Sequence, residues 1–493
     1  MAREILTVAE TSAADQAAIA AGASGGVLMD RAGAAVVAAI RARFAPRPVV
    51  VWCGPGNNGG DGYVIARKLR RLRWPVRVEA LAPPTTPDAR AAAQRWRGET
   101  GPLRAEPLPG VLYVDALFGA GLSRPLDGEA RRLARAFEGE GARIVAVDLP
   151  SGLSGDGAKP LGDALSAALT VTFHRRKPVH ALEPGRARCG ELVVADIGLG
   201  ETPSHLFEND PSLWAHHIPW PGIDAHKHAR GRMVVVSGGP WNTGAARLAA
   251  RGGLRIGAGL VTVLSPVDAL AVNAAHLEAI MLAPFDTAQA LETLADQADA
   301  AVVGPAAGGG EGTVEALFAL ARTGAALVVD ADALTSFRDD PERLFSALDR
   351  DDVLTPHPGE FERLFPGLLA ASLNRIAAAR QASRQAGTIV LLKGPDTVIA
   401  APDGRAAVNL NGSPWLATAG SGDVLAGFIA GLIAQGMESF DAACAGAWIH
   451  AEAGAAHGPG LIAEDLPDIC VKVLQRLFQE RNSLSGAVHR RSV

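Results

Sequence analysis

The chain has 493 residues, 48% of them hydrophobic and 20% charged, and its 47 basic and 52 acidic side chains give a formal net charge of -5. This composition is typical of a globular protein with sizeable cores, and the absence of a basic block argues against a nucleic-acid-binding protein. The length favours roughly two to four domains.

Four cysteines lie far apart with no CxxC pair, at Cys53, Cys189, Cys444 and Cys470. Such spacing predicts free thiols rather than a disulfide framework or a structural zinc site. Residues 1–16 carry charges and lack the apolar core of a signal peptide. The longest apolar stretch, residues 424–434, is too short to span a bilayer. We therefore expect a cytoplasmic protein with no membrane partner.

Short apolar runs alternate with Ala- and Arg-rich stretches through the first half of the chain. Continuous apolar runs are typical of buried parallel strands, and helical stretches between them predict βαβ units. The expected strands are Val49–Trp52, Val76–Leu81, Val111–Asp115, Ile144–Asp148, Leu169–Phe173 and Leu192–Ala195.

A second series of strands is expected beyond residue 223. Between the two series, Gly198–Ile223 contains four prolines and reads as a linker, because proline interrupts both helix and strand. The sequence thus predicts two α/β domains. The second series comprises Met233–Ser237, Leu260–Leu264, Ala301–Val303, Ala326–Asp330, Thr388–Leu392 and Thr397–Ala401.

The first expected strand leads into a glycine-rich segment, Cys53–Gly62, and we expect the next helix to begin near Tyr63. Glycines let backbone amides approach an anionic ligand, and a helix N-terminus adds partial positive charge. Open α/β sheets bind ligands at this end of their strands. A purely structural turn is the alternative, but it would not need the polar groups of Asn57, Asn58 and Asp61.

Polar clusters also follow three later strands, beginning at Asp115, Asp148 and Arg175. A single Asp at a strand end is usually a turn former, whereas several at one sheet edge favour a pocket. Asn58, Asp115 and Ser151 could supply hard oxygen ligands to a cation. Lys177 is either a partner in proton transfer or a solvated cation.

The segments GPGNNGGDG, DALFGAGLSRP and AVDLPSG, with LMDRAG near the start, resemble the NAD(P)H-hydrate epimerase family over residues 5–200. The resemblance implies a Rossmann-like three-layer epimerase domain at residues 1–217, with potassium at Asn58, Asp115 and Ser151. It also implies that Asp148 contacts the nicotinamide end, and we expect Asp148 to be the catalytic acid or base. The implied substrate-binding residues are Asn57, Asn58, Gly59, Gly60, Asp61, Gly119, Ala120, Gly121, Leu122, Ser123, Arg124, Pro125 and Asp148.

In the second half, Gly420, Ser421 and Gly422 precede an expected apolar helix. Amides at its start would form an anion hole for a transferring phosphoryl group, and Asp423 could accept a proton from a substrate hydroxyl. Asp423 could instead only favour the helix dipole. Lys393 could reach a nucleotide phosphate. His357 could bond a substrate or simply cap its loop.

These motifs resemble the ADP- or ATP-dependent NAD(P)H-hydrate dehydratase family, over residues 224–480. The resemblance implies a ribokinase-like α/β domain at residues 223–483 that uses Mg²⁺ and prefers ADP. Asp423 is the expected catalytic base. The implied substrate-binding residues are Ala245, Gly308, His357 and Asp423, and the implied nucleotide-binding residues are Lys393, Gly394, Pro395, Asp396, Thr397 and Gly422.

Together the two halves predict repair of NADHX and NADPHX, the hydrates of NADH and NADPH. The first would interconvert the R and S epimers at C6, and the second would dehydrate the S epimer with ADP, releasing AMP and phosphate. We also expect a homo-oligomer. A ribokinase-like small-molecule kinase carrying a non-catalytic dinucleotide-binding domain is the main alternative. Another is a non-enzymatic first half that binds a dinucleotide or another protein, with the second half alone catalytic.

Overall fold

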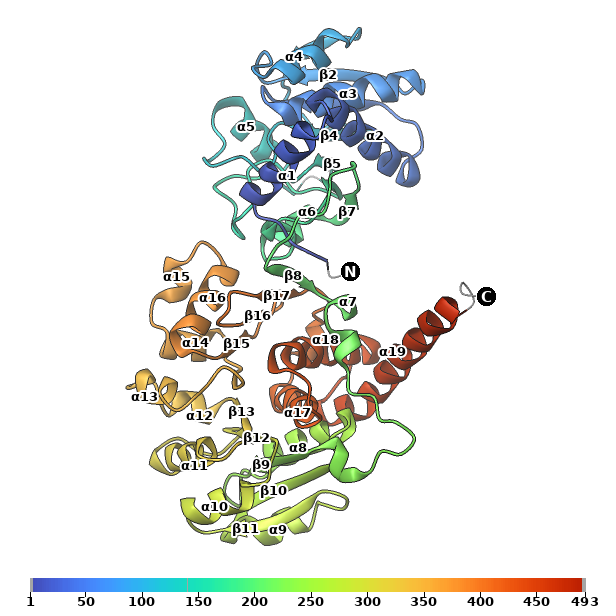
Figure 1. Cartoon of the computed structure of the whole chain (residues 1–493). Helices are drawn as coiled ribbons and strands as arrows, with labels where there is room; N and C mark the ends of the chain where they lie inside the picture. Colours follow the sequence, from blue (N-terminus) through green and yellow to red (C-terminus); the bar gives the residue numbers. More distant parts are fainter. Residues whose placement is uncertain (1–2, 140, 490–493) are drawn as a thin grey trace. The chain divides into compact units, whose positions relative to one another are not determined.

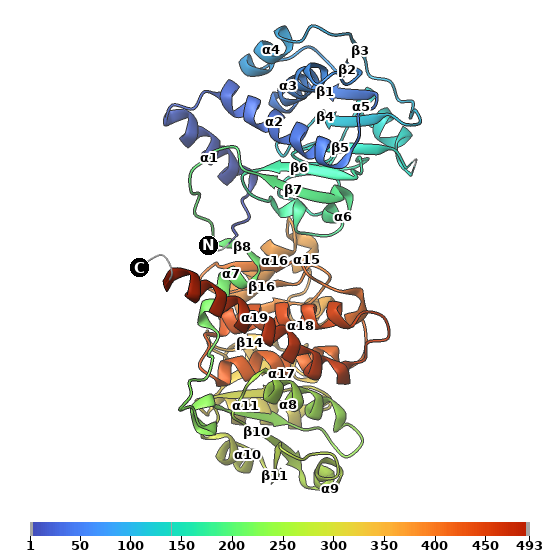
Figure 2. The same ribbon diagram turned by 90° about the vertical axis from the view of Figure 1, so that its right-hand side faces the viewer.

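The computed structural model describes residues 3–139 and 141–489. These form two compact units, one spanning Glu4–Leu206 and the other beginning at Phe207 (Figures 1 and 2). In the described residues all four cysteines are buried free thiols, as predicted. Over the same ranges, every helix is either too short or too polar to cross a membrane.

The first unit is built on a seven-stranded, all-parallel sheet in the order β3-β2-β1-β4-β5-β6-β7. This includes the 3-2-1-4-5-6 order of doubly wound dinucleotide-binding folds, which confirms the expected Rossmann-like class. The strand order changes direction at β1: β2 and β3 lie on one side of β1, and β4 to β7 lie on the other. The strands are β1 Val49–Cys53, β2 Val76–Ala80, β3 Thr100–Pro102, β4 Leu112–Ala116, β5 Arg143–Val147, β6 Leu169–Phe173 and β7 Glu191–Ala195.

Separate apolar cores on the two faces of this sheet give the unit its three layers. Helices α2 and α3 cover one face. On the other face, α5 packs with a cluster in which Trp52 stacks on Tyr113 at 4.9 Å and Phe137 meets both rings edge-on. The helices are α1 Val8–Ala20, α2 Gly25–Arg43, α3 Asn57–Arg71, α4 Pro87–Gln94, α5 Gly128–Ala136 and α6 Gly185–Cys189.

Helix α3 begins at Asn57, so the expected start near Tyr63 is wrong. The glycines that suggested a loop lie in the first turns of the helix and let it approach the strands. A Cβ on Gly62 would lie 2.8 Å from both the Ala116 side chain and Cys53 Sγ. Glycine is unfavourable inside a helix, and here this close packing offsets its cost.

The second unit contains a ten-stranded sheet in the order β11-β10-β9-β12-β13-β14-β15-β16-β17-β8. Its strands are parallel from β11 to β15, and β16 and β17 are antiparallel. The strands are β8 Leu206–Asn209, β9 Arg232–Val236, β10 Leu260–Pro266, β11 Met281–Phe285, β12 Ala300–Val303, β13 Ala326–Val329, β14 Val353–Leu354, β15 Ile389–Leu392, β16 Val398–Ala400 and β17 Ala406–Asn409.

Helices cover both faces of the second sheet, with α8 and α17–α19 on one side and α10–α16 on the other (Figure 1). Helices α8 and α17 meet at their backbones, since a Cβ on Gly427 would lie 2.1 Å from the Ala249 carbonyl oxygen. The longer helices are α8 Gly244–Ile256, α10 Ala288–Ala295, α11 Glu311–Ala321, α14 Pro358–Leu364, α16 Arg375–Ala386, α17 Ser421–Ala434, α18 Ser439–His457 and α19 Leu466–His489. The shorter ones are α7 Pro211–Trp214, α9 Leu270–Ala274, α12 Asp332–Thr335, α13 Pro341–Phe345 and α15 Leu368–Ala371.

Part of the expected linker is folded into the second unit. Strand β8 forms the edge of the larger sheet, and α7 follows it directly. Asn209 anchors this segment, because its amide donates to Asn409 Oδ1 at 3.0 Å and accepts from Trp214 Nε1 at 2.9 Å. Proline signals suggested a linker here, but Pro211 occupies the first turn of α7, where proline is tolerated.

Candidate active sites

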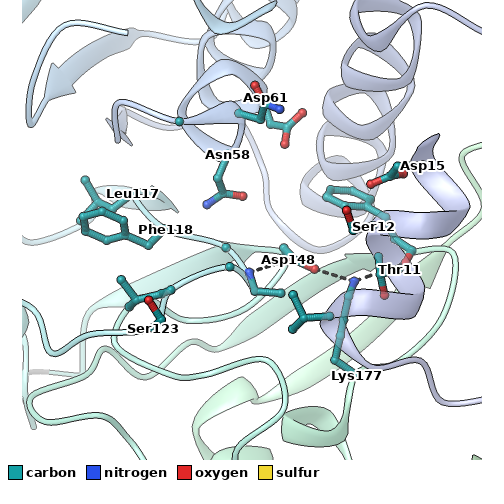
Figure 3. A pocket seen from close by; sticks show the side chains of 18 of the residues that line it. Thr11, Ser12, Asp15, Asn58, Asp61, Leu117, Phe118, Ser123, Asp148 and Lys177 are labelled. Atoms are coloured by element: carbon teal, nitrogen blue, oxygen red, sulfur yellow. Dashed lines mark hydrogen bonds and ion pairs between the residues drawn. The ribbon is translucent and has the colours of Figure 1, made fainter. Parts of the chain in front are cut away.

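The first unit has a pocket of about 560 Å³ at the carboxyl ends of its strands (Figure 3). The loops after β1, β4 and β5 converge there, as open α/β sheets allow. Most of the residues predicted to bind the hydrated dinucleotide line it. They are Asn57, Asn58, Asp61, Gly119, Ala120, Gly121, Leu122, Ser123, Arg124 and Asp148.

Three residues of the predicted binding set do not line this pocket, namely Gly59, Gly60 and Pro125. A Cβ on Gly59 would lie 1.8 Å from the Gly54 carbonyl oxygen, and one on Gly60 would lie 2.5 Å from Met29 Cε. These two glycines therefore allow the tight turn and helix packing that place Asn57 and Asn58 at the pocket.

The predicted cation ligands separate into a buried pair and a residue on the pocket wall. Asp115 Oδ2 accepts from the Ser151 amide at 2.7 Å, and Asp115 Oδ1 accepts from Ser151 Oγ at 2.7 Å and the Leu117 amide at 3.2 Å. Ser151 Oγ accepts from the Phe118 amide. These bonds tie the β4 loop to the β5 loop. Asn58 lines the pocket, next to Gly119.

Asp148 is held in a strained backbone conformation, with φ at +69°. Its Oδ1 accepts from Lys177 Nζ at 2.8 Å and from Thr172 Oγ1 at 3.0 Å, and its Oδ2 accepts from the Ala120 amide at 2.9 Å. Burial alone would raise the pKa of Asp148, but Lys177, His180 and the Ala120 amide outweigh it and hold the pKa at about 2. The structure thus makes Lys177 a buried partner of Asp148 and not a solvated cation.

Helix α1 forms a wall of the pocket that our sequence interpretation missed. Val8, Thr11, Ser12 and Asp15 all face the cavity from this helix. Asp156 holds the start of α1, because its Oδ1 accepts from the Val8 amide at 2.8 Å. A capping box at the N-terminus of α1 is visible in the sequence, but no local signal shows where the helix docks. Phe173, Lys177, Ile197 and Leu199 complete the additional lining.

Two polar atoms at this pocket are buried without a hydrogen-bond partner, Thr11 Oγ1 and Asn58 Nδ2. Buried polar groups are usually satisfied, so unpaired ones on a cavity wall point to a polar ligand. Helix α3 adds further donors, since its N-cap is Gly56 and no side chain caps its first amides.

In the second unit, Lys393 and Gly422 lie together, as the sequence interpretation requires. A Cβ on Gly422 would lie 3.5 Å from Lys393 Nζ. Lys393 Nζ donates to Asp330 Oδ1 at 2.8 Å and lies 3.9 Å from Glu360 Oε2. Burial would lower the pKa of Lys393, but the carboxylates of Asp330 and Glu360 outweigh it and raise that pKa. Lys393 therefore stays charged. Asp330 and Glu360 were given no role by our sequence interpretation.

Asp423 lies in the first turn of α17, whose N-cap, Gly420, has a left-handed φ of +86°. No side chain caps this helix, so its first amides are available to an anion. Burial raises the pKa of Asp423 to about 6, Asp330 and Asp332 add to the shift, and Lys393 opposes it. A carboxylate with this pKa is suited to accept a proton near neutral pH.

The remaining predicted residues of the second site have structural roles that limit how they could bind a ligand. His357 caps α14, because its Nδ1 accepts from the Gly359 and Glu360 amides, and its Nε2 lies 3.3 Å from Glu360 Oε1. Asp396 is buried against Arg375, and Thr397 Oγ1 bonds the backbone of Gly394. The KGPDT loop would therefore meet a nucleotide through Lys393 and its backbone.

Gly308 lines a separate recess of about 270 Å³ with Gly238 and Gly239. The Gly308 amide donates to Asp332 Oδ2 at 2.9 Å. The Asp332 carboxylate is one of the charges that raise the pKa of Asp423, so this bond links the recess to Asp423. Ala245 lies in the first turn of α8 and does not line the recess.

The two halves match two protein families. Residues 25–179 match the family described as YjeF-related protein N-terminus, and residues 233–470 match NAD(P)H-hydrate dehydratase. The chain is 37% identical to the bifunctional NAD(P)H-hydrate repair enzyme Nnr of Moorella thermoacetica, covering 94% of each chain. It is 35% identical to the enzyme of the same name from Salinibacter ruber, covering 97% of each.

The chain belongs to the family of bifunctional NAD(P)H-hydrate repair enzymes. Membership confirms the resemblance predicted from the sequence and makes the chain a bifunctional enzyme. It is also similar to a solved ribokinase-like superfamily protein from Enterococcus faecalis V583 (22% identity, 57% of this chain, 99% of that chain, TM-score 0.49). A solved ADP/ATP-dependent NAD(P)H-hydrate dehydratase from Bacillus subtilis is 26% identical, with 55% of this chain and 98% of that chain covered and a TM-score of 0.49.

Replacing Lys177 with methionine should destabilise the first unit. The substitution leaves the Asp148 carboxylate buried without its counter-charge, and breaking a buried pair in this way typically costs about 3 kcal/mol. Chemical denaturation of the full chain, followed by tryptophan fluorescence, measures the loss. Lys159→Met is the matched control, because Lys159 is exposed. Equal stability of both variants would show that the pair contributes nothing to folding.

Proposed function

We propose that the first unit interconverts the R and S hydrates of NADH and NADPH at C6, and that the second unit dehydrates the S epimer with ADP. The pairing of an epimerase with a dehydratase is the activity of the family to which the chain belongs. The observation that best supports this division is a separate polar site in each unit, each with an uncapped helix start and a lysine paired with an aspartate.

For the epimerase half, the proposal rests on the pocket wall formed by Asn57, Asn58 and the loop Gly119–Arg124. Uncapped amides of α3 suit a diphosphate, and Asp148 with Lys177 suits the nicotinamide end. Lys177 Nζ can donate a proton to the C6 hydroxyl and Asp148 can accept one, so the pair can serve as an acid/base group.

We assign a potassium ion to Asn58, Asp115 and Ser151, whose oxygens are the hard ligands that such a cation prefers. Asp115 fits this role, because burial raises its pKa to about 6 while its three hydrogen-bond partners are neutral donors. A bound cation would compensate this buried carboxylate and fix the β4 and β5 loops. In the described ranges no group of three His, Cys, Asp or Glu side chains could hold a metal by itself.

Replacing potassium with lithium should lower the epimerisation rate, since the smaller ion cannot span the same ligands. Asp115→Asn should remove this difference between the two salts. Chromatographic separation of the R and S hydrates at equal ionic strength measures both rates. Equal rates in potassium and lithium for the unsubstituted chain would contradict the assignment.

For the dehydratase half, Asp423 takes the proton of the C6 hydroxyl as that oxygen attacks the terminal phosphoryl group of ADP. Lys393 and the first amides of α17 hold the phosphoryl oxygens. Phosphate then leaves C6 and a proton leaves C5, which restores the double bond of the dihydronicotinamide; AMP is the other product. Mg²⁺ would neutralise phosphate charge, and it needs only one or two carboxylates such as Asp330. On nucleotide binding, the ammonium group of Lys393 would pair with the nucleotide phosphates in place of Asp330.

Supplying both hydrate epimers with ADP and Mg²⁺ should restore the full absorbance of reduced nicotinamide. Asp423→Asn should abolish recovery and leave epimerisation intact, while Asp148→Asn should slow epimerisation and spare dehydration of the S epimer. If the unsubstituted chain restored the absorbance of only one epimer's share of the hydrate, the proposed epimerase activity would be contradicted. A stable phosphorylated product would identify a small-molecule kinase instead.

The dehydratase should lose activity in acid with a midpoint near pH 6. Asp423 acts as a base only when it is deprotonated, and its pKa is raised to about 6. The value of kcat/KM for the S hydrate should therefore be level above pH 7 and fall about tenfold per pH unit below 5. Stopped assays at each pH measure it. A flat profile from pH 5 to 8 would exclude Asp423 as the base.

The location and assembly of the protein stay predictions. We propose a cytoplasmic enzyme, which the four reduced, buried cysteines support. We also propose a homo-oligomer, which light scattering of the purified chain tests.

A further inference from the structure

Epimerisation at a hydroxyl-bearing carbon requires chemistry on both faces of that carbon. The Asp148–Lys177 pair described above serves only one face of a ring bound in the pocket. Figure 3 shows Asp61 and Asp15 on the opposite side of the cavity from Asp148 and Lys177. Asp61 comes from the first turns of α3, and Asp15 comes from α1, which precedes residues 25–179, the part that matches the YjeF-related family model.

We propose that Asp61 and Asp15 together form the second acid/base group of the epimerase pocket and act on the face of C6 opposite Asp148 and Lys177. This inference rests on the proposed epimerase function of the first unit. It assigns a catalytic role to α1, which reaches the pocket from the N-terminal end of the chain.

The two carboxyl groups line the same cavity, and each can hold a proton of its own. Neither has a hydrogen bond or ion pair to another side chain in the described part of the chain, in contrast to Asp148 with its several donors. Burial raises the pKa of Asp61 well above its usual range, and the charges of Asp148 and Asp15 add to this. Burial also raises the pKa of Asp15, and Lys177 opposes that shift. Burial and like charge thus favour the protonated form of each carboxyl group, from which it can donate a proton.

Two further observations support a polar ligand between the side of the cavity with Asp61 and Asp15 and the side with Asp148. Thr11 Oγ1, one helical turn before Asp15, is buried and unpaired, and so is Asn58 Nδ2, one turn before Asp61. Both atoms belong to residues that line the same cavity. A substrate ring held by these groups would have carboxyl chemistry on each side.

The proposed step is an exchange of the C6 hydroxyl through water. The C6–O bond breaks, the oxygen leaves as water with a proton from the Asp61–Asp15 pair, and the N1 lone pair forms a C6=N1 double bond. Water then adds to the other face of C6 and gives a proton to the Asp148–Lys177 pair, as the π electrons return to N1. Each conversion of S to R therefore moves one proton from the Asp61–Asp15 pair to the Asp148–Lys177 pair, and exchange with solvent water returns it before the next turnover. In the reverse direction the two pairs exchange roles.

The test uses the full chain without ADP, so that the dehydratase half does not turn over. Pure S hydrate is supplied, and appearance of the R hydrate is followed by chromatography against a blank without enzyme. Asp61→Asn and Asp15→Asn should each lower kcat by about 100-fold, a usual effect of losing a general acid or base, with KM changed less than about threefold. Gln16→Asn is the matched control, because Gln16 is the exposed neighbour of Asp15 on α1.

Whether the substitutions change kcat or KM decides between a catalytic and a structural role for Asp61 and Asp15. A raised KM with kcat retained would mean that α1 only forms a wall of the pocket, and it would overturn the inference. So would rates within threefold of the unsubstituted chain for either variant. If the unsubstituted chain does not exceed the blank, the epimerase function itself fails, which is a separate result.

Labelled water provides a second measurement. In H₂¹⁸O every inverted molecule should carry one ¹⁸O at C6, because the departing oxygen is replaced by solvent. Inversion with the original oxygen retained would exclude the water exchange and with it the need for an acid on the second face.

Discussion

Both sites depend on helices that begin without a side-chain cap. Helix α3 starts after Gly56 and α17 starts after Gly420, and neither glycine can satisfy the first-turn amides. An uncapped helix start is a cost for the folded protein that an anionic ligand can offset. Ser, Thr or Asp at these positions would stabilise the empty helix and compete with the ligand. The glycines at these two positions therefore leave the first-turn amides open to an anionic ligand, at a cost in local stability.

A second constraint shared by the two sites is a lysine that pairs with an aspartate following another strand. Lys177 follows β6 and pairs with Asp148 after β5, and Lys393 follows β15 and pairs with Asp330 after β13, each at 2.8 Å. A buried charge needs a partner, so each pair keeps an ammonium group at a sheet edge where substrate phosphates or hydroxyls would arrive. The pKa values of the carboxyl groups at the two sites are shifted in opposite directions. Asp148 is held ionised, whereas Asp423 titrates near neutrality.

The sequence was sufficient where one local pattern determines one element. Continuous apolar runs located most of the central strands of both sheets, because strands buried on both faces need apolar residues throughout. Strand β14 has only two residues and was missed, since such a short run carries no periodicity. The start of α3 was misplaced because glycines favour loops by propensity, and only the packing against Cys53 and Ala116 explains them in a helix.

The candidate sites show the same limit more sharply. Residues in the glycine-rich and strand-end motifs could be predicted, because their spacing and their place at one sheet edge carry the signal. Asp15 could not, since it lies in an Ala-rich helix whose docking is set by contacts such as Val8 with Asp156, far away in the sequence. The role of Lys177 stayed open for the same reason, as only the fold shows that its ammonium group is buried beside Asp148. A local motif identifies the ligand-binding edge of a sheet, whereas the groups that complete the chemistry come from elements brought there by tertiary packing.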